Sequence, residues 1–352
     1  MNEQDKIKTP RIVLVGGVSA DSLTTYLEPF DTNGKNRTAP GMTDIVMGGG
    51  AGNAAQAISR INHVFPGQPV SIAIITEMGT AVPGQITDKI SHEVVAHHLK
   101  ESNIECVDIA RGACAIAFNT VVEHTGGRMI FVENTIAAPR DMKPDADKLV
   151  EDGLKGADYV LLGSSKPHIS VMAARAAKKL GVTILTDWDS NTWPDDQAAS
   201  DMCEEILELS DIIMVPSDTV VKGMANKVEN PAELFRRLQG RYGARNILMS
   251  NGGNNVRALV DSVEHAIAVE KHSGHLYALA AGDHRNAMLL YSLAQGDNML
   301  TAFSKATAFA SLKIKHPRFE WINHVHELAK HSAYAANDNR TPADNSPALD
   351  SL

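Results

Sequence analysis

The sequence predicts an α/β fold in which helices flank a doubly wound, mostly parallel sheet. Residues 11–18 (RIVLVGGV) form an apolar run with a double glycine, which is typical of a buried parallel strand. From residue 145 onward, strand-length and helix-length segments alternate regularly, as in repeated βα units. Several predicted strands end in polar residues, which is where such sheets bind ligands.

The first half of the chain predicts further strands and two helices. Residues 22–46 show no helical period and are interpreted as an excursion from the main sheet. A turn at 124–127 joins the last two strands, and this hairpin predicts an antiparallel patch attached to the parallel sheet. Asn62 is interpreted as a C-cap. The predicted strands are 70–75, 104–109, 113–123 and 128–133, and the predicted helices are 47–61 and 84–101.

The second half predicts the regular alternation and a C-terminal tail. Strands are expected at 159–163, 183–186, 211–215, 246–250, 256–260 and 266–269. Helices are expected at 147–154, 169–180, 197–209, within 220–242, and at 299–313 and 318–335. Residues 336–352 are rich in Asn, Asp, Pro and Ser, and we expect them to be disordered.

Composition narrows the classes of partner. The formal net charge of −9 disfavours nucleic acid or an anionic membrane as a partner. The three cysteines are scattered without a CxxC pair, so neither a zinc site nor a disulfide framework is indicated, and no metal ligands are assigned. No stretch approaches the length of a membrane span, and a cytoplasmic location is expected.

The stretch 279–296 carries the strongest chemical pattern. The small residues Ala280, Ala281 and Gly282 lead into Asp283, and an apolar helical period follows. Asp283 should therefore lie in the first turn of a helix, where free backbone N–H groups and the helix dipole favour anions. An acid beside an anion pocket suits a base that takes a hydroxyl proton while amides hold a phosphoryl group. The alternative is an acid that only offsets the helix dipole.

A second candidate region lies near the N-terminus. Gly48-Gly49-Gly50 opens a helix that continues through Asn53, so a substrate could lie against bare backbone. Close packing of helix and sheet explains the glycines about as well. Asp21 follows the first predicted strand and is interpreted either as a ligand-binding residue or as a turn residue.

Together these segments resemble the ribokinase-like (PfkB) family of sugar and nucleoside kinases. Residues 48–53 are similar to the family's GG-x-G-x-N pattern, and residues 277–283 stand where DTTGAGD occurs. The run 282–287 stands where GD-T-F-N-G occurs, and residues 250–252 resemble the T-L-G of the nucleotide site. The resemblance covers roughly residues 10–315, and residues 10–330 are expected to form one domain.

The resemblance implies a role for each motif. Asp283 would be the general base, with Ala281 and Gly282 in an anion hole. Ser250, Gly252 and Asn286 would bind the nucleotide, and ATP and Mg²⁺ would be the cofactors. A β lid at about 19–47 and 107–135 would close over the substrate and allow a homodimer. The substrate-binding positions would be Asp21, Gly49, Gly50 and Asn53.

Three departures concern the nucleotide and metal. The family's NxxE motif is replaced by residues 216–219 (PSDT), where only Asp218 could substitute. Of its D-P-N-x-R segment, only Asp187 is kept. Ala280 replaces a glycine. If this position needs a positive φ, the alanine would be strained by roughly 1 kcal/mol.

The sequence therefore predicts an ATP-dependent kinase that phosphorylates a primary hydroxyl of a small sugar or nucleoside. The main alternative is a degenerate member that binds a nucleotide or sugar as a regulatory or scaffold subunit. A dinucleotide-dependent oxidoreductase is disfavoured because the glycines at 16–17 lack the third glycine of that fingerprint.

Overall fold

The computed structural model describes residues 8–327, apart from 27–40, 67–68, 125–126, 134–140, 189–192, 218, 222–230, 251–255, 271, 273–275 and 317–318. The expected tail at 336–352 lies outside the described residues. Within the described residues, every helix is too short or too polar to cross a membrane.

A nine-stranded sheet forms the centre of the molecule, in the order β13-β12-β11-β10-β9-β8-β1-β4-β5. The seven strands from β11 to β5 are parallel, and β12 and β13 add an antiparallel hairpin at one edge. The bounds are β1 Arg11–Val15, β4 Ser71–Thr76, β5 Glu105–Asp108, β8 Tyr159–Gly163, β9 Thr183–Asp187, β10 Ile212–Pro216, β11 Asn246–Ser250, β12 Val256–Val260 and β13 Val263–Ile267. This mixed, mostly parallel sheet confirms the predicted fold class.

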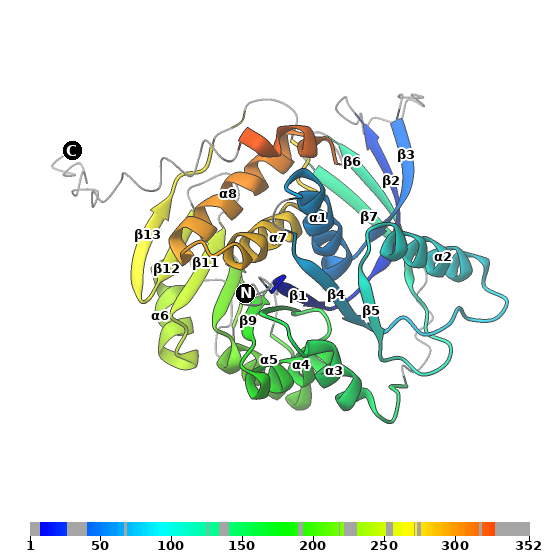
Figure 1. The fold of residues 1–352 in the computed structure, drawn as a ribbon, viewed down its shortest axis with the longest axis horizontal. Helices are drawn as coiled ribbons and strands as arrows, with labels where there is room; N and C mark the ends of the chain where they lie inside the picture. The colour runs from blue at the N-terminus through cyan, green and yellow to red at the C-terminus, as the bar shows by residue number, and fades with distance from the viewer. Residues whose placement is uncertain are drawn as a thin grey trace, which may run out of the picture.

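Helices cover both faces of this sheet (Figure 1). One face carries α1 Gly50–Val64, α7 Ala281–Ala294 and α8 Met299–Lys315. The other carries α3 Ala146–Leu154, α4 Pro167–Leu180, α5 Gln197–Leu209 and α6 Pro231–Tyr242.

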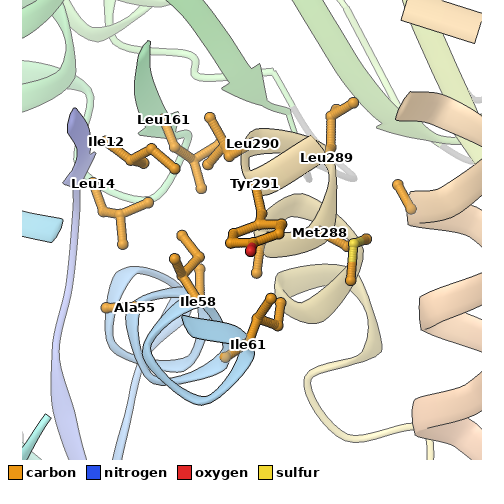
Figure 2. Close-up of a cluster of buried hydrophobic side chains, with 14 of the residues drawn as sticks. Ile12, Leu14, Ala55, Ile58, Ile61, Leu161, Met288, Leu289, Leu290 and Tyr291 are labelled. Atoms are coloured by element: carbon orange, nitrogen blue, oxygen red, sulfur yellow. The ribbon is translucent and has the colours of Figure 1, made fainter. Parts of the chain in front are cut away.

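Successive strand residues alternate between the two cores, as period-two side chains require. Ile12 and Leu14 pack with α1 and α7, whereas Val13 and Val15 face α3 and α4. Figure 2 shows the first of these cores, where Ile58 of α1 and Leu290 of α7 pack with Ile12 of β1 and Leu161 of β8. Because α1 and α7 share this core, their N-terminal turns are held in fixed relative positions.

A separate four-stranded sheet lies to one side, in the order β3-β2-β6-β7. The hairpin of β6 and β7 is antiparallel, as expected, but β2 and β6 pair in parallel and the patch is a sheet of its own. Helix α2 packs against it. The bounds are β2 Ser19–Tyr26, β3 Gly41–Gly48, β6 Ala117–His124, β7 Gly127–Glu133 and α2 Ile86–Glu101.

Two local predictions are wrong. The expected helix at 318–335 is, in its described part, a 3₁₀ segment, η1 Glu320–Glu327. Asn62 does not cap α1, which continues to Val64. Its side chain instead donates to the Val70 carbonyl and accepts from the Val70 N–H, at 2.8 and 3.0 Å. This pair of bonds joins the end of α1 to the start of β4.

Candidate functional site

The N-terminal turns of α1 and α7 meet through one side-chain hydrogen bond. Asn53 Nδ2 donates to Asp283 Oδ2 at 2.8 Å, although the two residues are 230 positions apart. Asp283 Oδ1 faces α1, because a Cβ placed on Gly50 would lie 3.5 Å from it. The bond therefore fixes one edge of the carboxylate, and with it the direction in which the acid points.

Asp21 lies on β2 and is held by two donors. Ser19 Oγ and Asn119 Nδ2 both donate to its Oδ1, at 2.7 and 2.8 Å. Burial raises the pKa of Asp21 above its ordinary value, and these two hydrogen bonds only partly oppose that rise. Asn119, on β6, was not singled out from the sequence, because only the pairing of β2 with β6 brings it next to Asp21.

Three consecutive glycines, Gly48, Gly49 and Gly50, stand at the start of α1. A Cβ on Gly48 would lie only 2.0 Å from Asp21 Oδ2, so this glycine makes room for the carboxylate. Gly49 is the N-cap of α1, with φ 79° and ψ 152°. Gly50 is the first residue of that helix. The run therefore provides both close packing and an open backbone, the two interpretations that the sequence left open.

The loop before α7 places Ala280 in a left-handed conformation. Its φ is 58° and its ψ is 17°. The position therefore has the positive φ at which the sequence predicts a strained alanine. Ala281 and Gly282 are the first two residues of α7, and Asp283 is the third. His284 Nδ1 bonds the Ala280 carbonyl at 2.8 Å and holds the strained residue in place.

Replacing Ala280 by Gly is expected to raise the free energy of unfolding by up to about 1 kcal/mol. Glycine relieves the backbone strain of the left-handed conformation, which is roughly 1–2 kcal/mol. Part of this gain in stability is lost because glycine gives the unfolded chain more conformational entropy. Chemical denaturation measures the change. The contrasting variant, Ala287→Gly in the interior of α7, should lower stability by more than about 0.5–1 kcal/mol, because it also removes a buried methyl group. Equal losses in both variants would contradict a left-handed Ala280.

A buried acid, amide and guanidinium cluster lies one turn further along α7. Asn286 Nδ2 donates to Asp187 Oδ2 at 2.6 Å, and Arg285 Nη2 lies 3.4 Å from Asp187 Oδ1. Arg285 is 6% exposed. The sequence could have indicated Arg285 as a site residue, because this charged residue stands where the GD-T-F-N-G motif has phenylalanine. The cluster ties the end of β9 to α7.

The other predicted nucleotide residues are only partly described. Ser250 ends β11, and its carbonyl accepts from the Ser217 N–H at 2.7 Å. Ser217 therefore lies beside Ser250 at the ends of β10 and β11. Gly252 and Asp218 lie outside the described residues.

Two adjoining pockets meet where Asn53 bonds Asp283. The first is lined by Asp21, Leu23, Val46, Asn53, Leu279, Ala280, His284, Lys313 and Phe319. The second is lined by Val15, Gly16, Gly17, Gly50, Ala51, Leu161, Gly163, Ser165, Asp187, Asp283 and Asn286. Asp21 and Asn53 thus line one pocket and Asp283 the other, and the hydrogen bond from Asn53 to Asp283 links the two linings.

A buried ion cluster lies beside the glycines that follow β1. Glu77 is 3% exposed and accepts from Lys166 Nζ at 2.8 Å and from His168 Nε2 at 2.7 Å. Burial alone would raise the pKa of Glu77, but the bonds from His168 and Lys166 outweigh it and lower that pKa to about 2. Lys166 also approaches Gly17, which lines the second pocket.

The stability contributed by this cluster should depend on pH. Because the folded pKa of Glu77 is lowered, its contribution is complete above about pH 4.5 and is lost as the pH falls towards 2. The difference in unfolding free energy between the native protein and Glu77→Gln should therefore shrink over that range. The exposed Glu93→Gln is the control, with an expected change below about 0.5 kcal/mol throughout. A pH-independent difference for Glu77→Gln would contradict the assignment.

Among the described residues, no group of three or more His, Cys, Asp or Glu side chains is arranged to hold a metal ion. Asp187 and Asp283 do line the same pocket. Mg²⁺ is commonly bound by one or two carboxylates together with substrate phosphates. Two carboxylates in one pocket are donors that suit a Mg²⁺ ion arriving with a nucleotide, but Asp187 is also bonded by Asn286 and Arg285, with which such an ion would compete.

Known structures share this fold over nearly the whole chain. A putative ribokinase from Agrobacterium tumefaciens is 18% identical, with a TM-score of 0.69, over 93% of this chain and 99% of that one. Ribokinase from Arabidopsis thaliana, complexed with ribose and ATP, is 18% identical, with a TM-score of 0.63, over 92% and 99%. Phosphofructokinase-2 from Escherichia coli, in a tetrameric inhibited form, is 16% identical, with a TM-score of 0.65, over 94% and 100%.

Sequence comparison gives the family. A search of curated protein sequences finds no match. The model of the pfkB family of carbohydrate kinases matches residues 17–319, which is most of the chain. The segments that resemble the family's motifs, 48–53 and 277–283, each contribute residues to both pockets. The chain therefore belongs to the pfkB family of carbohydrate kinases.

Proposed function

We propose that the protein is an ATP-dependent kinase that phosphorylates a primary hydroxyl of a small sugar or nucleoside. The observation that carries the proposal is the hydrogen bond from Asn53 to Asp283, which sets an oriented carboxylate at the start of α7. Family membership and the fold shared with sugar kinases support the same activity.

Asp283 would act as the general base. A carboxylate within hydrogen-bond reach of the substrate hydroxyl takes its proton while the oxygen attacks the γ-phosphorus of ATP. The new O–P bond forms as the bond to the ADP oxygen breaks, and the proton remains on Asp283. Because Asn53 holds Oδ2, the Oδ1 edge that faces Gly50 is the edge suited to the substrate.

The phosphoryl group would lie at the N-terminus of α7. Backbone N–H groups of Ala281 and Gly282 are in the first turn, where helix N–H groups have no partner within the helix and the dipole favours negative charge. Ser250, Gly252 and Asn286 are the proposed nucleotide residues. Mg²⁺ bound with ATP would neutralise phosphate charge, and Asp187, which lines the second pocket, would help to hold it.

The substrate would occupy the first pocket. Asp21 and Asn53 line this pocket and offer hydrogen bonds to hydroxyls. Gly49 and Gly50 begin α1, and Gly50 lines the second pocket with Asp283, so the ring would extend along this backbone towards the base. Asp21 stands on the small sheet, so substrate binding would draw this sheet over the site and exclude water. One of the structures with the same fold contains ribose and ATP, which supports a site that binds a sugar together with ATP.

The small sheet would also join two copies of the chain. It exposes large apolar side chains, a pattern that marks association surfaces in soluble proteins. These are Ile45, Ile130, Phe131 and Val132, which are 45–57% exposed. We propose a homodimer through this sheet, and sedimentation of Phe131→Lys against the native protein tests it.

One observation favours the alternative, a binding protein without turnover. The Asp187 carboxylate is already bonded by Arg285 and Asn286, so a nucleotide-borne cation would have to compete with a guanidinium. ADP release over a panel of sugars and nucleosides with ATP and Mg²⁺ separates the two functions. Turnover supports the kinase. A rise in melting temperature with ATP or a sugar, but no turnover, supports the binding protein.

A further inference from the structure

A buried lysine lies directly behind the loop that leads to Asp283. Lys313 is in the last turn of α8 and is 3% exposed, which is rare for lysine because burial of a charge is costly. Its Nζ donates to the backbone carbonyl of Tyr277 at 3.0 Å, and its side chain lines the same pocket as Asp21 and Asn53. The free-energy cost of burying the Lys313 charge must therefore be offset by the interactions that the ammonium makes at this position.

The lysine and its helix hold one end of the loop. Besides the ammonium contact, the Tyr277 N–H donates to the Ile314 carbonyl at 2.8 Å, so the main chain of Tyr277 is bonded to α8 in both directions. The other end is held by His284, which bonds the Ala280 carbonyl through its N–H and through Nδ1. The three residues between Tyr277 and Ala281 thus have little freedom to move.

The charge of Lys313 reaches the first turn of α7. Burial and, next to it, the nearby positive charge of Lys313 together lower the pKa of His284 to about 3. His284 is therefore neutral at ordinary pH, and its Nδ1 carries the proton that is donated to Ala280. Lys313 is then the fixed charge that adds to the positive end of the α7 dipole.

We infer that Lys313 is a built-in cation of the phosphoryl site: it positions the loop 277–280 and adds fixed positive charge behind the amides of Ala281 and Gly282. It is a positioning residue, because it acts through the loop and the helix and not by contact with the reacting atoms. The inference rests on the proposed function for its effect on turnover, but the effect on anion binding is independent of turnover.

The test compares Lys313→Met with the native protein and with Lys315→Met. Methionine keeps the length and removes the charge. Lys315 is on the same helix, pairs with Glu270 at the surface and is the matched control. Lys313→Met should lower kcat about 10- to 100-fold with a small change in sugar KM, less than the loss of a direct anion-hole donor. Lys315→Met should stay within twofold, and Lys313→Arg should retain more activity than Lys313→Met.

A second readout needs no turnover. Titration calorimetry with ATP and with ADP gives the ratio of the two affinities, which reports on the γ-phosphate alone. Lys313→Met should lower this ratio several-fold, and Lys315→Met should leave it unchanged. If the native protein turns over no substrate but the ratio still falls in Lys313→Met, the kinase proposal fails and this inference stands. An unchanged ratio and kcat in a folded Lys313→Met protein would overturn it.

Chemical rescue separates charge from packing. Lys313→Ala leaves a space that ammonium ion can enter and tetramethylammonium is too large to fill. At equal ionic strength, ammonium chloride should restore part of the ATP-to-ADP affinity ratio and of kcat, whereas tetramethylammonium chloride should not. Equal responses to both salts would overturn the inference, and this comparison remains available if Lys313→Met does not fold.

Discussion

Asp283→Asn should lower kcat at least about 100-fold and up to about 10,000-fold, the range associated with loss of a general base. Asparagine has the same shape, and its side-chain oxygen can still accept from Asn53, so the fold should be retained. The measurement is steady-state ADP release together with the melting temperature, which should shift by only a few degrees.

The control for this substitution is Asp201→Asn. Asp201 is an exposed acid on α5 that accepts a hydrogen bond from Gln197 on the same helix, and its replacement removes the same charge away from the pockets. Its kcat should equal that of the native protein. Comparable activity in Asp283→Asn and Asp201→Asn would assign the base to another residue.

Gly49→Ala should destabilise the protein by at least about 3 kcal/mol. The backbone at φ 79° and ψ 152° is open essentially only to glycine, at a cost of about 1–3 kcal/mol for other residues. A Cβ there would also lie 2.4 Å from the Gly17 carbonyl oxygen, so the strand-end loop or α1 must move. Denaturant unfolding measures the loss.

Gly240→Ala provides the contrast for Gly49→Ala. Gly240 lies in α6 at the surface, and a Cβ there meets nothing within 4 Å. Alanine is the better helix former, so this variant should gain about 0.5–1 kcal/mol. A Gly49→Ala protein as stable as Gly240→Ala would show that the start of α1 differs from the structure described.

Elements with a clear apolar period were predictable from the sequence. Helix α5 has the predicted bounds Gln197–Leu209, and β8 has the predicted bounds Tyr159–Gly163. Their patterns depend only on neighbouring residues and on which face is buried. The positions of Asn53 and Asp283 in the first turns of helices followed from the same patterns, whereas Asp21, expected just after the first strand, lies within β2 of the small sheet. The family resemblance is what proposes the three as one site.

Features that depend on distant pairing could not be read locally. Asn119 meets Asp21 only because β2 and β6 pair in parallel, an arrangement that no local pattern encodes. Asn62 has the composition of a C-cap but bonds the chain before β4 instead. In the sequence, Lys313 is the last residue of a predicted helix and has no pattern that indicates burial. It is buried because the loop at Tyr277 packs over it.

Transfer of labelled phosphate tests the central claim most directly. The native protein is incubated with ATP carrying a radioactive γ-phosphate, Mg²⁺ and the sugar panel, in parallel with Asp283→Asn, and labelled sugar phosphate is measured. We predict label on a sugar hydroxyl with the native protein and almost none with the variant. Equal labelling by both proteins, or label released solely as inorganic phosphate, would contradict a sugar kinase that uses Asp283 as its base.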